Sequence, residues 1–306
     1  MIIVITGPTC LGKSETAVNV ALKINAEIVN GDAFQSYKEF DIGVAKPSKE
    51  LLKKVPHHLY SFVDPRHEYS IMEYQQVLRE AIKKITSRGK NVIIVGGSGL
   101  YIRSALYDYS FKEESKVDMT KFESMNNQEL HGFLEQIDKI EADKIHENNR
   151  KRVLRAIKIY YSQNTKKSDI IAKQKHKPIY DDVLFFVRDM DRAKLYERIN
   201  LRVDQMVKDG LYEEFIRLYS KYGNVNAMQA IGYKEFIDIG NTSEDFEKAI
   251  DLIKQHTRNY AKRQMTFIRH QFPVNFYKKD DDIIEVINNE HLSRQNNWII
   301  RKRKSW

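Results

Sequence analysis

A glycine-rich segment near the N-terminus constrains the fold more than any other stretch of the chain. Residues 2–5 form an apolar, β-branched run that is typical of a buried strand. Residues 7–14, GPTCLGKS, fit the pattern G-x-x-x-x-G-K-[ST], and a helical pattern with apolar residues on one face follows. Strand, glycine loop and helix in this order are the context in which the pattern binds phosphate. The segment therefore predicts a phosphate site at the start of an α/β sheet.

The chemistry of this loop favours an anionic ligand. Backbone N–H groups of such a loop, and of the helix that follows it, point towards the anion. Lys13 adds a positive charge, and the Ser14 hydroxyl is a ligand for Mg²⁺. The pattern alone leaves open whether the ligand is a nucleotide, the default, or another diphosphate ester. The expected loop residues are Gly7, Pro8, Thr9, Cys10, Leu11, Gly12, Lys13 and Ser14.

Two further strand ends carry polar or glycine-rich sequence. Residues 26–30 are predicted to be a strand, with Gly31 and Asp32 directly after it. Residues 91–95 are predicted to be another strand, which is followed by GGSGLY. In open α/β sheets the ligand crevice lies beyond the carboxyl ends of the strands. Asp32 is therefore placed to face the ligand of the loop, although an ordinary turn aspartate is the alternative. The alternation of strands and helices predicts an α/β fold, with a parallel sheet flanked by helices around the phosphate loop.

The middle of the chain differs in character from both ends. Residues 111–182 contain no convincing strand and much polar, helical sequence, whereas a strand is expected again at 182–188. The predicted organisation is an α/β core with a mainly helical insertion and a basic tail. The expected boundaries are 1–110 and 183–290 for the core, 111–182 for the insertion and 291–306 for the tail.

Positive charge is unevenly spread along the chain. The 306 residues carry a net charge of +9, which indicates a polyanionic partner without proving one. Lys151, Arg152 and Arg155 lie on or beside one face of a predicted helix, and the alternative for such a stripe is a solvated surface. Arg192, Arg198 and Arg202 follow on a later helix, where they are either surface charges or clamps for an anion.

Several classes of protein are disfavoured. The single cysteine, Cys10, excludes an internal disulfide and any cysteine-based zinc site. No apolar run approaches the roughly 20 residues of a membrane helix. The chain begins directly with the predicted strand, so we expect no signal peptide, no membrane association and a cytoplasmic location.

Taken together, eight segments in order resemble the tRNA dimethylallyltransferases, which modify the adenosine next to the anticodon. The resemblance covers nearly the whole chain, from about residue 7 to residue 269. The segments are GPTCLGKS, Asp32 to Tyr37 with DIGVAKP after it, PHHL, VGGSGLY, NRKRVLRAIKIY, RINLRVDQM, AIGYKEF and TRNYAKRQMTF.

The resemblance implies a reaction and roles for particular residues. The loop is expected to hold the diphosphate of dimethylallyl diphosphate, and the dimethylallyl group is expected to move to N6 of adenosine 37 of a tRNA, with release of diphosphate. Asp32 matches the catalytic base, and Ser98 stands where the family usually has threonine. Mg²⁺ bound through Ser14 and the arginines that match Arg192 and Arg198 are expected to neutralise the diphosphate.

The resemblance also implies how RNA is recognised. The helical insertion is expected to grip the anticodon stem, and the enzyme is expected to act as a monomer. Ala33 stands where the family commonly has serine, so a hydroxyl contact at that position is not expected. The implied tRNA-contacting residues are Asp32, Ala33, Phe34, Gln35, Ser98, Lys151, Arg152, Val153, Leu154 and Arg155.

Three other functions remain as alternatives. A small-molecule kinase of the same fold would consume ATP and need no RNA. A binding module without chemistry would hold tRNA without transfer, but intact Lys13, Ser14, Asp32 and Ser98 argue against such loss. Prenylation of free AMP would leave the long basic insertion without a role.

Overall fold

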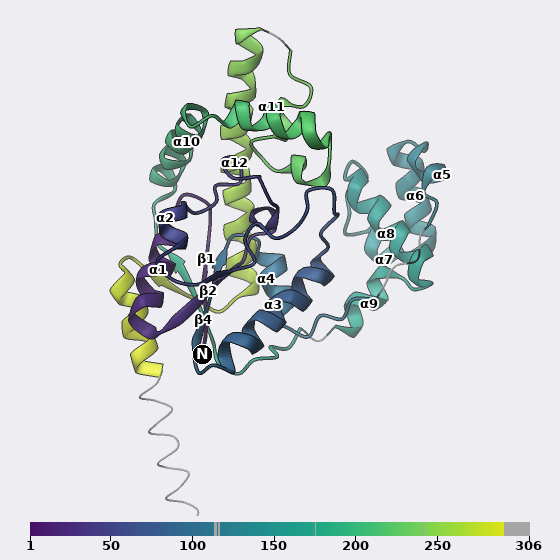
Figure 1. Ribbon diagram of the computed structural model, residues 1–306. Helices are drawn as coiled ribbons and strands as arrows, with labels where there is room; N and C mark the ends of the chain where they lie inside the picture. Colours follow the sequence, from purple (N-terminus) through teal and green to yellow (C-terminus); the bar gives the residue numbers. More distant parts are fainter. Residues whose placement is uncertain (113–114, 116, 175, 241, 291–306) are drawn as a thin grey trace, which may run out of the picture. The chain divides into compact units, whose positions relative to one another are not determined.

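The computed structural model describes residues 1–112, 115, 117–174, 176–240 and 242–290, and the chain forms two compact units (Figure 1). One unit consists of Met1–Leu106 together with the chain from Tyr180 onward, and the other of Tyr107–Ile179. These boundaries differ by a few residues from the predicted ones. The predicted basic tail lies outside the described residues.

The first unit is built on a six-stranded parallel sheet, which confirms the predicted α/β class. The strand order is β3-β2-β4-β1-β5-β6, and each neighbouring pair is parallel. The three central strands are almost entirely buried, as expected when helices cover both faces of a parallel sheet. The strands are β1 (Ile2–Thr6), β2 (Ala26–Asn30), β3 (His57–His58), β4 (Asn91–Gly96), β5 (Val183–Arg188) and β6 (Val274–Tyr277).

Successive residues of a strand point to opposite faces, so strands that are apolar throughout need helices on both faces of the sheet. Ile3 and Ile5 of β1 pack in one apolar cluster with helix α1 (Lys13–Ile24) and with Ile283 of the helical residues 280–290. Helix α3 (Ile71–Thr86) contacts β2 and β4, and Figure 1 shows α1 and α3 on either side of these strands. An S-x-x-E capping box begins α3, in which Ser70 and Glu73 exchange hydrogen bonds.

The remaining elements of this unit frame the carboxyl ends of the strands. They are η1 (Phe34–Ser36), α2 (Lys49–Leu52), α4 (Gly99–Leu106), α10 (Arg192–Lys208), α11 (Leu211–Tyr222), η2 (Asn226–Gln229), η3 (Lys234–Phe236) and α12 (Ser243–Gln271). The long helix α12 contacts both α4 and α10, so it joins the start and the end of the chain.

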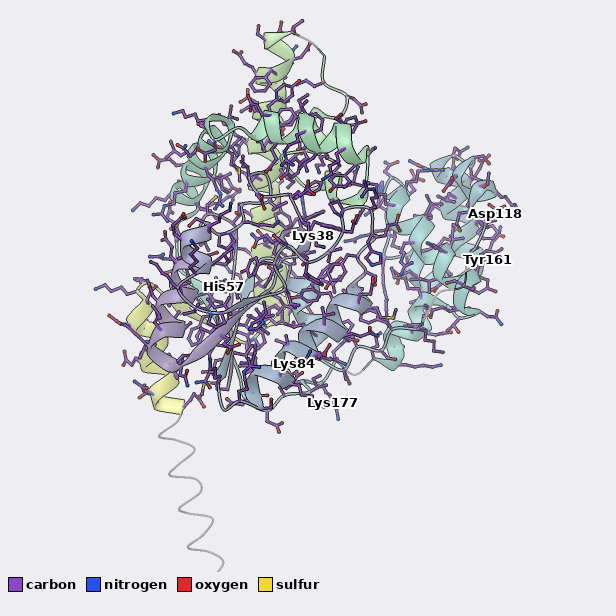
Figure 2. All side chains as sticks on the ribbon, viewed as in Figure 1. Lys38, His57, Lys84, Asp118, Tyr161 and Lys177 are labelled. Atoms are coloured by element: carbon purple, nitrogen blue, oxygen red, sulfur yellow. The ribbon has the colours of Figure 1, made fainter. Side chains whose placement is uncertain are left out.

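The second unit is mainly helical, as predicted. It has its own apolar core, to which Leu130, Val153 and Ile157 contribute fully buried side chains. Tyr161, labelled in Figure 2, stacks on Phe133 with the ring centroids 6.4 Å apart. The helices are α5 (Thr120–Glu123), α6 (Asn127–Ile137), α7 (Lys139–Ala142), α8 (Arg150–Gln163) and α9 (Lys167–Lys173).

A buried carboxylate ties the edge of the sheet to the chain between α3 and β4. Glu27 of β2 is only 3% exposed. Its two oxygens accept hydrogen bonds from His58 (2.7 Å), Arg88 (2.7 Å) and Lys90 (2.8 Å). Burial raises the pKa of Glu27, but the hydrogen bonds from Lys90 and His58 and the charge of Arg88 outweigh burial and hold it below its usual value. The charged form of Glu27 therefore stabilises the fold.

We expect Glu27→Gln to lower the free energy of unfolding by about 1–3 kcal/mol at pH 7, because it removes the buried charge that holds the partly exposed Arg88, Lys90 and His58. A carboxyl whose pKa is depressed by folding stabilises the protein above its unfolded pKa and loses this effect as the pH falls. The difference between wild type and Glu27→Gln should therefore shrink below about pH 4. Urea unfolding at both pH values measures it.

The matched control is Glu244→Gln. Glu244 forms an exposed helical pair with Lys248 at 2.8 Å, and such pairs contribute about 0.3–0.5 kcal/mol. An equal loss of stability in the two variants would contradict a special role for Glu27.

Candidate active site

The phosphate-loop pattern forms a tight turn between β1 and α1. Gly7, Cys10 and Gly12 all have positive φ, at 133°, 66° and 72°. Gly12 stands at the N-cap of α1, and no side chain of the described residues caps the helix there. N–H groups at a helix start carry partial positive charge and bind anions when they have no internal partner. The start of α1 can therefore receive a phosphate.

Lys13 is held inside this turn. Its Nζ atom donates a hydrogen bond to the carbonyl oxygen of Pro8 at 2.6 Å. Burial lowers the pKa of Lys13 to about 8, although the nearby charge of Asp32 partly offsets this effect. The ammonium group thus lies within electrostatic reach of the Asp32 carboxylate.

Asp32 is fixed by a buried asparagine at the end of β2. The Asp32 amide donates to Asn30 Oδ1 at 2.9 Å, and Asn30 Nδ2 donates to the Asp32 carbonyl oxygen at 2.8 Å. Asp32 Oδ1 accepts a hydrogen bond from the amide of Phe34 at 3.1 Å. Burial raises the pKa of Asp32, while the hydrogen bond from Phe34 and the charge of Lys13 act in the opposite direction. A carboxylate with a raised pKa is a stronger proton acceptor.

Two glycines allow the ends of β2 and β4 to meet. A Cβ atom at Gly96 would overlap the backbone of Gly31, and a Cβ atom at Gly31 would lie 3.2 Å from the Gly96 nitrogen, a tight contact. The Ser98 amide donates to the Gly31 carbonyl oxygen at 3.2 Å, and Ser98 Oγ accepts a hydrogen bond from the Ala33 amide at 3.2 Å. Ser98 therefore lies beside the backbone that carries Asp32.

A cavity of about 700 Å³ connects the phosphate loop to Asp32. It brings together many of the residues that the sequence analysis selected. Those that line it are Thr9, Cys10, Leu11, Gly12, Lys13, Ser14, Asp32, Phe34, Gln35 and Arg198. Gly7, Ala33 and Ser98 are not part of the lining. Gly7 and Ala33 are close to lining residues in the chain, and Ser98 forms a hydrogen bond with Ala33.

Arg192 is placed elsewhere. With Pro8 it lines a second cavity, of about 350 Å³, and its guanidinium group lies over the ring of Tyr196 at 5.1 Å. Arg198 and Arg192 thus do not share a pocket, although the resemblance assigned both of them to the diphosphate. Arg202, one turn after Arg198 on α10, lines the larger cavity instead.

The wall opposite the phosphate loop is a segment held by a distant glutamate. Residues 43–47 line the cavity. Glu214 of α11 is buried and accepts hydrogen bonds from the amides of Asp41, Ile42 and Gly43 at 2.9–3.3 Å. It also accepts a hydrogen bond from the hydroxyl of Tyr233 at 2.6 Å. The position of this wall is therefore set by α11, which lies far along the chain.

Sequence reasoning missed the contribution of α12 to the cavity. Tyr260 and Gln264 face it from successive turns, and Arg263 lines it as well. Burial and the charge of Asp32 raise the pKa of Tyr260. The i, i+4 spacing of Tyr260 and Gln264 in the segment TRNYAKRQMTF is the signal in the sequence for a shared helix face.

The five residues selected on α8 divide between its core and its surface. Val153 is fully buried in the core of the helical unit, and Leu154 packs against the same cluster. Lys151, Arg152 and Arg155 are exposed. Only these three basic side chains of the five are therefore presented for contact with a polyanion.

The described residues contain no group of three or more His, Cys, Asp or Glu side chains that could hold a metal ion. Among the same residues, no helix is long and apolar enough to cross a membrane. A Mg²⁺ ion at Ser14 would therefore depend on phosphate oxygens of a substrate for most of its ligands, which is the usual arrangement for this ion in phosphate sites.

The chain is similar to known proteins over most of its length. A family model described as IPP transferase matches residues 35–271, so the match begins just after Asp32. The tRNA dimethylallyltransferase of Anoxybacillus flavithermus is 42% identical over 92% of this chain and 92% of its own length. That of Staphylococcus carnosus is 40% identical over 99% of this chain and 98% of its own length.

Solved structures agree with the sequence relatives. A tRNA delta(2)-isopentenylpyrophosphate transferase from Staphylococcus epidermidis matches with a TM-score of 0.69 and 40% identity, over 94% of this chain and 99% of that one. A eukaryotic dimethylallyltransferase acting on tRNA matches with a TM-score of 0.77 and 28% identity, over 97% and 79% of the two chains. The resemblance seen in the sequence is confirmed, and the chain belongs to the IPP transferase family.

Proposed function

We propose that this protein transfers the dimethylallyl group of dimethylallyl diphosphate to N6 of adenosine 37 in tRNA and releases diphosphate. The observation that carries the proposal is the shared cavity, in which a phosphate-binding helix start and a buried carboxylate face the same space. An alkyl transfer to an amine needs these two functions together, namely a site for the anionic leaving group and an acceptor for the proton. The names of the relatives support the substrates.

In the proposed reaction the N6 lone pair forms a bond to C1 of the dimethylallyl group. The bond between C1 and the diphosphate oxygen breaks, and its electrons leave with the diphosphate. Asp32 takes the proton that N6 loses. Because an adenine amine is a weak nucleophile, most of the rate enhancement must come from positioning and from stabilising the departing charge.

The leaving diphosphate would be received by the start of α1 and by the cationic side chains of Lys13, Arg198 and Arg202, which line the same cavity. When bound through Ser14 and the substrate, Mg²⁺ would add positive charge at the leaving oxygens. We place Arg192 outside this set, since it lines the smaller cavity. Ser98 Oγ accepts a hydrogen bond from the Ala33 amide, and through this bond Ser98 would hold the backbone beside Asp32.

The second unit would supply the RNA contact of the proposed enzyme. Lys151, Arg152 and Arg155 present three cationic side chains on one exposed helix, which suits the phosphates of an anticodon stem. The target base must leave its stack to enter the cavity, at a cost of a few kcal/mol that is smallest in a single-stranded loop. As expected from the sequence, we also propose that the protein acts in the cytoplasm as a monomer.

Transfer of labelled dimethylallyl diphosphate to unmodified tRNA tests the proposal, with AMP and ATP in parallel reactions. We expect label in tRNA alone. Consumption of ATP without labelled tRNA would instead support a kinase, and label in AMP would support prenylation of a free nucleotide.

Asp32→Asn should reduce the rate of transfer by roughly 10²–10⁴-fold, the range expected when a general base is lost. The amide keeps the shape of the side chain, so the dissociation constant for tRNA should stay within about twofold of wild type. Asp64→Asn, at an exposed aspartate, is the control for the same chemical change. A near-normal rate in Asp32→Asn would remove Asp32 from the mechanism.

The pH dependence of kcat/KM for dimethylallyl diphosphate should be bell-shaped. Activity should rise with pH as Asp32 loses its proton, with a midpoint above the ordinary value of 3.8, because burial raises the pKa of this carboxyl. Activity should fall above a pH of about 8 as Lys13 loses its charge. Lys13→Arg should move the basic limb to higher pH, since a guanidinium stays protonated.

Lys46→Arg is the matched control for this shift, because Lys46 also lines the cavity and burial also lowers its pKa. If the basic limb moved in Lys46→Arg and stayed unchanged in Lys13→Arg, the limb would belong to Lys46, and the assignment to Lys13 would be wrong.

Replacing Lys151, Arg152 and Arg155 by alanine together should weaken tRNA binding and flatten its salt dependence. Each lost phosphate contact should reduce the slope of log K against log salt by up to about 0.9. Filter binding between 50 and 200 mM salt measures this slope. The control replaces Lys121, Lys139 and Lys144, three exposed lysines of the same unit, and changes the net charge equally. Equal slopes for the two triple variants would show that the α8 residues act only through bulk charge.

A further inference from the structure

One buried hydrogen-bond acceptor in the cavity has no partner in the described structure. Gln264 of α12 is 5% exposed and lines the cavity. Its Nε2 atom donates to the carbonyl oxygen of Gly97 at 2.9 Å, but its Oε1 atom accepts no hydrogen bond from any residue that the structure describes. Buried polar atoms are nearly always paired, so an unpaired acceptor beside a cavity indicates that a ligand supplies the donor.

The position of Gln264 is set by two contacts that leave it little freedom. A Cβ atom at Gly97 would overlap Gln264 Nε2, so glycine at this position leaves room for the amide as it is placed. The bond to the Gly97 oxygen also fixes which way the amide faces, because a reversed amide would set two oxygens against each other. The free oxygen is therefore a fixed feature of the site.

Gln264 is also close to the base. The amide of Gly97 forms a hydrogen bond that lowers the pKa of Asp32, so the Gln264 amide and the Asp32 carboxylate lie on the two sides of one glycine. Tyr260, one turn earlier on α12, senses the charge of Asp32 as well. The free acceptor and the proton acceptor thus belong to the same end of the cavity.

We propose that Gln264 Oε1 accepts a hydrogen bond from the exocyclic amino group of the acceptor adenine, using the N–H that Asp32 does not take. This inference rests on the proposed function. An adenine amino group has two N–H bonds, and a glutamine oxygen is a common partner for it. With one N–H on each acceptor, the amine is held in one orientation, and its lone pair is directed at the carbon that it attacks. Gln264 is then a substrate-orienting residue.

The test is a cycle of two proteins and two RNAs. Anticodon stem-loops with adenine or with purine, which lacks the amino group, at the target position are titrated into wild type and Gln264→Met. Methionine keeps the length of the side chain and removes its hydrogen bonds. We expect Gln264→Met to weaken binding of the adenine stem-loop roughly 3- to 10-fold, the effect of one hydrogen bond, and to leave binding of the purine stem-loop unchanged.

A second variant keeps the proposal testable if Gln264→Met does not fold. Gln264→Glu in its protonated form can still donate to the Gly97 oxygen and retains an acceptor at this point, so it should keep the preference for adenine over purine. Loss of the preference in Gln264→Glu would overturn the proposal.

Gln75→Met is the matched control, because Gln75 is a buried glutamine whose Nε2 atom also donates to a backbone oxygen, that of Ser104, at 2.7 Å. We expect a loss of stability from it but no change in base preference. Transfer by wild type is measured first, and its absence would refute the proposed function. Normal transfer together with an equal loss for both stem-loops in Gln264→Met would refute only the role of Gln264.

Discussion

The contact between Gly31 and Gly96 determines the geometry of the whole site. The Gly31 amide donates to the carbonyl oxygen of Val95 at 2.7 Å, and no Cβ atom fits at Gly96. Parallel strands of similar length already end at one edge of a sheet, but here Gly31, which follows β2, lies against Gly96, the last residue of β4. Asp32 leaves one strand where Gly97 and Ser98 leave the other. Asp32, the glycine whose carbonyl oxygen accepts from the Gln264 amide and the start of α4 are thus positioned by one close approach of two backbones.

The electrostatics of the cavity depend on two opposite charges, those of Lys13 and Asp32, that burial disfavours. Burial lowers the pKa of Lys13 and raises the pKa of Asp32. The charge of each group partly offsets the effect of burial on the other. Removing water strengthens every interaction between charges in such a site. A diphosphate entering beside Lys13 would favour the protonated amine, whereas its negative charge would favour protonation of Asp32. The proposed reaction needs both groups in their charged forms, so the nearby opposite charge matters for each of them.

The sequence predicted the centre of the fold better than its edges. The runs at 2–5, 26–30 and 91–95 are β-branched and fully buried, so composition alone identified them, and the α/β class is confirmed. The strands β3 and β6 were missed, because two histidines and a four-residue segment with exposed side chains carry no such signal. In the site, Arg192 and Arg198 are six residues apart and so face different sides of α10 at 100° per residue. Which side meets the phosphate loop depends on packing against α12, which the sequence does not reveal. The individual roles of the site residues stay predictions.

The order in which the cavity walls occur along the chain has a consequence for synthesis on the ribosome. The phosphate loop and Asp32 come first, within β1, α1 and β2, whereas the residues that enclose them, from Arg198 to Gln264, come after the entire helical unit. The amides of segment 41–43 likewise have their hydrogen-bond acceptor, Glu214, only after that later residue has been synthesised. A nascent chain that has just emerged as far as the helical unit thus carries the reactive groups on an open sheet edge. Such a chain cannot exclude water from them until α12 has left the exit tunnel and docked.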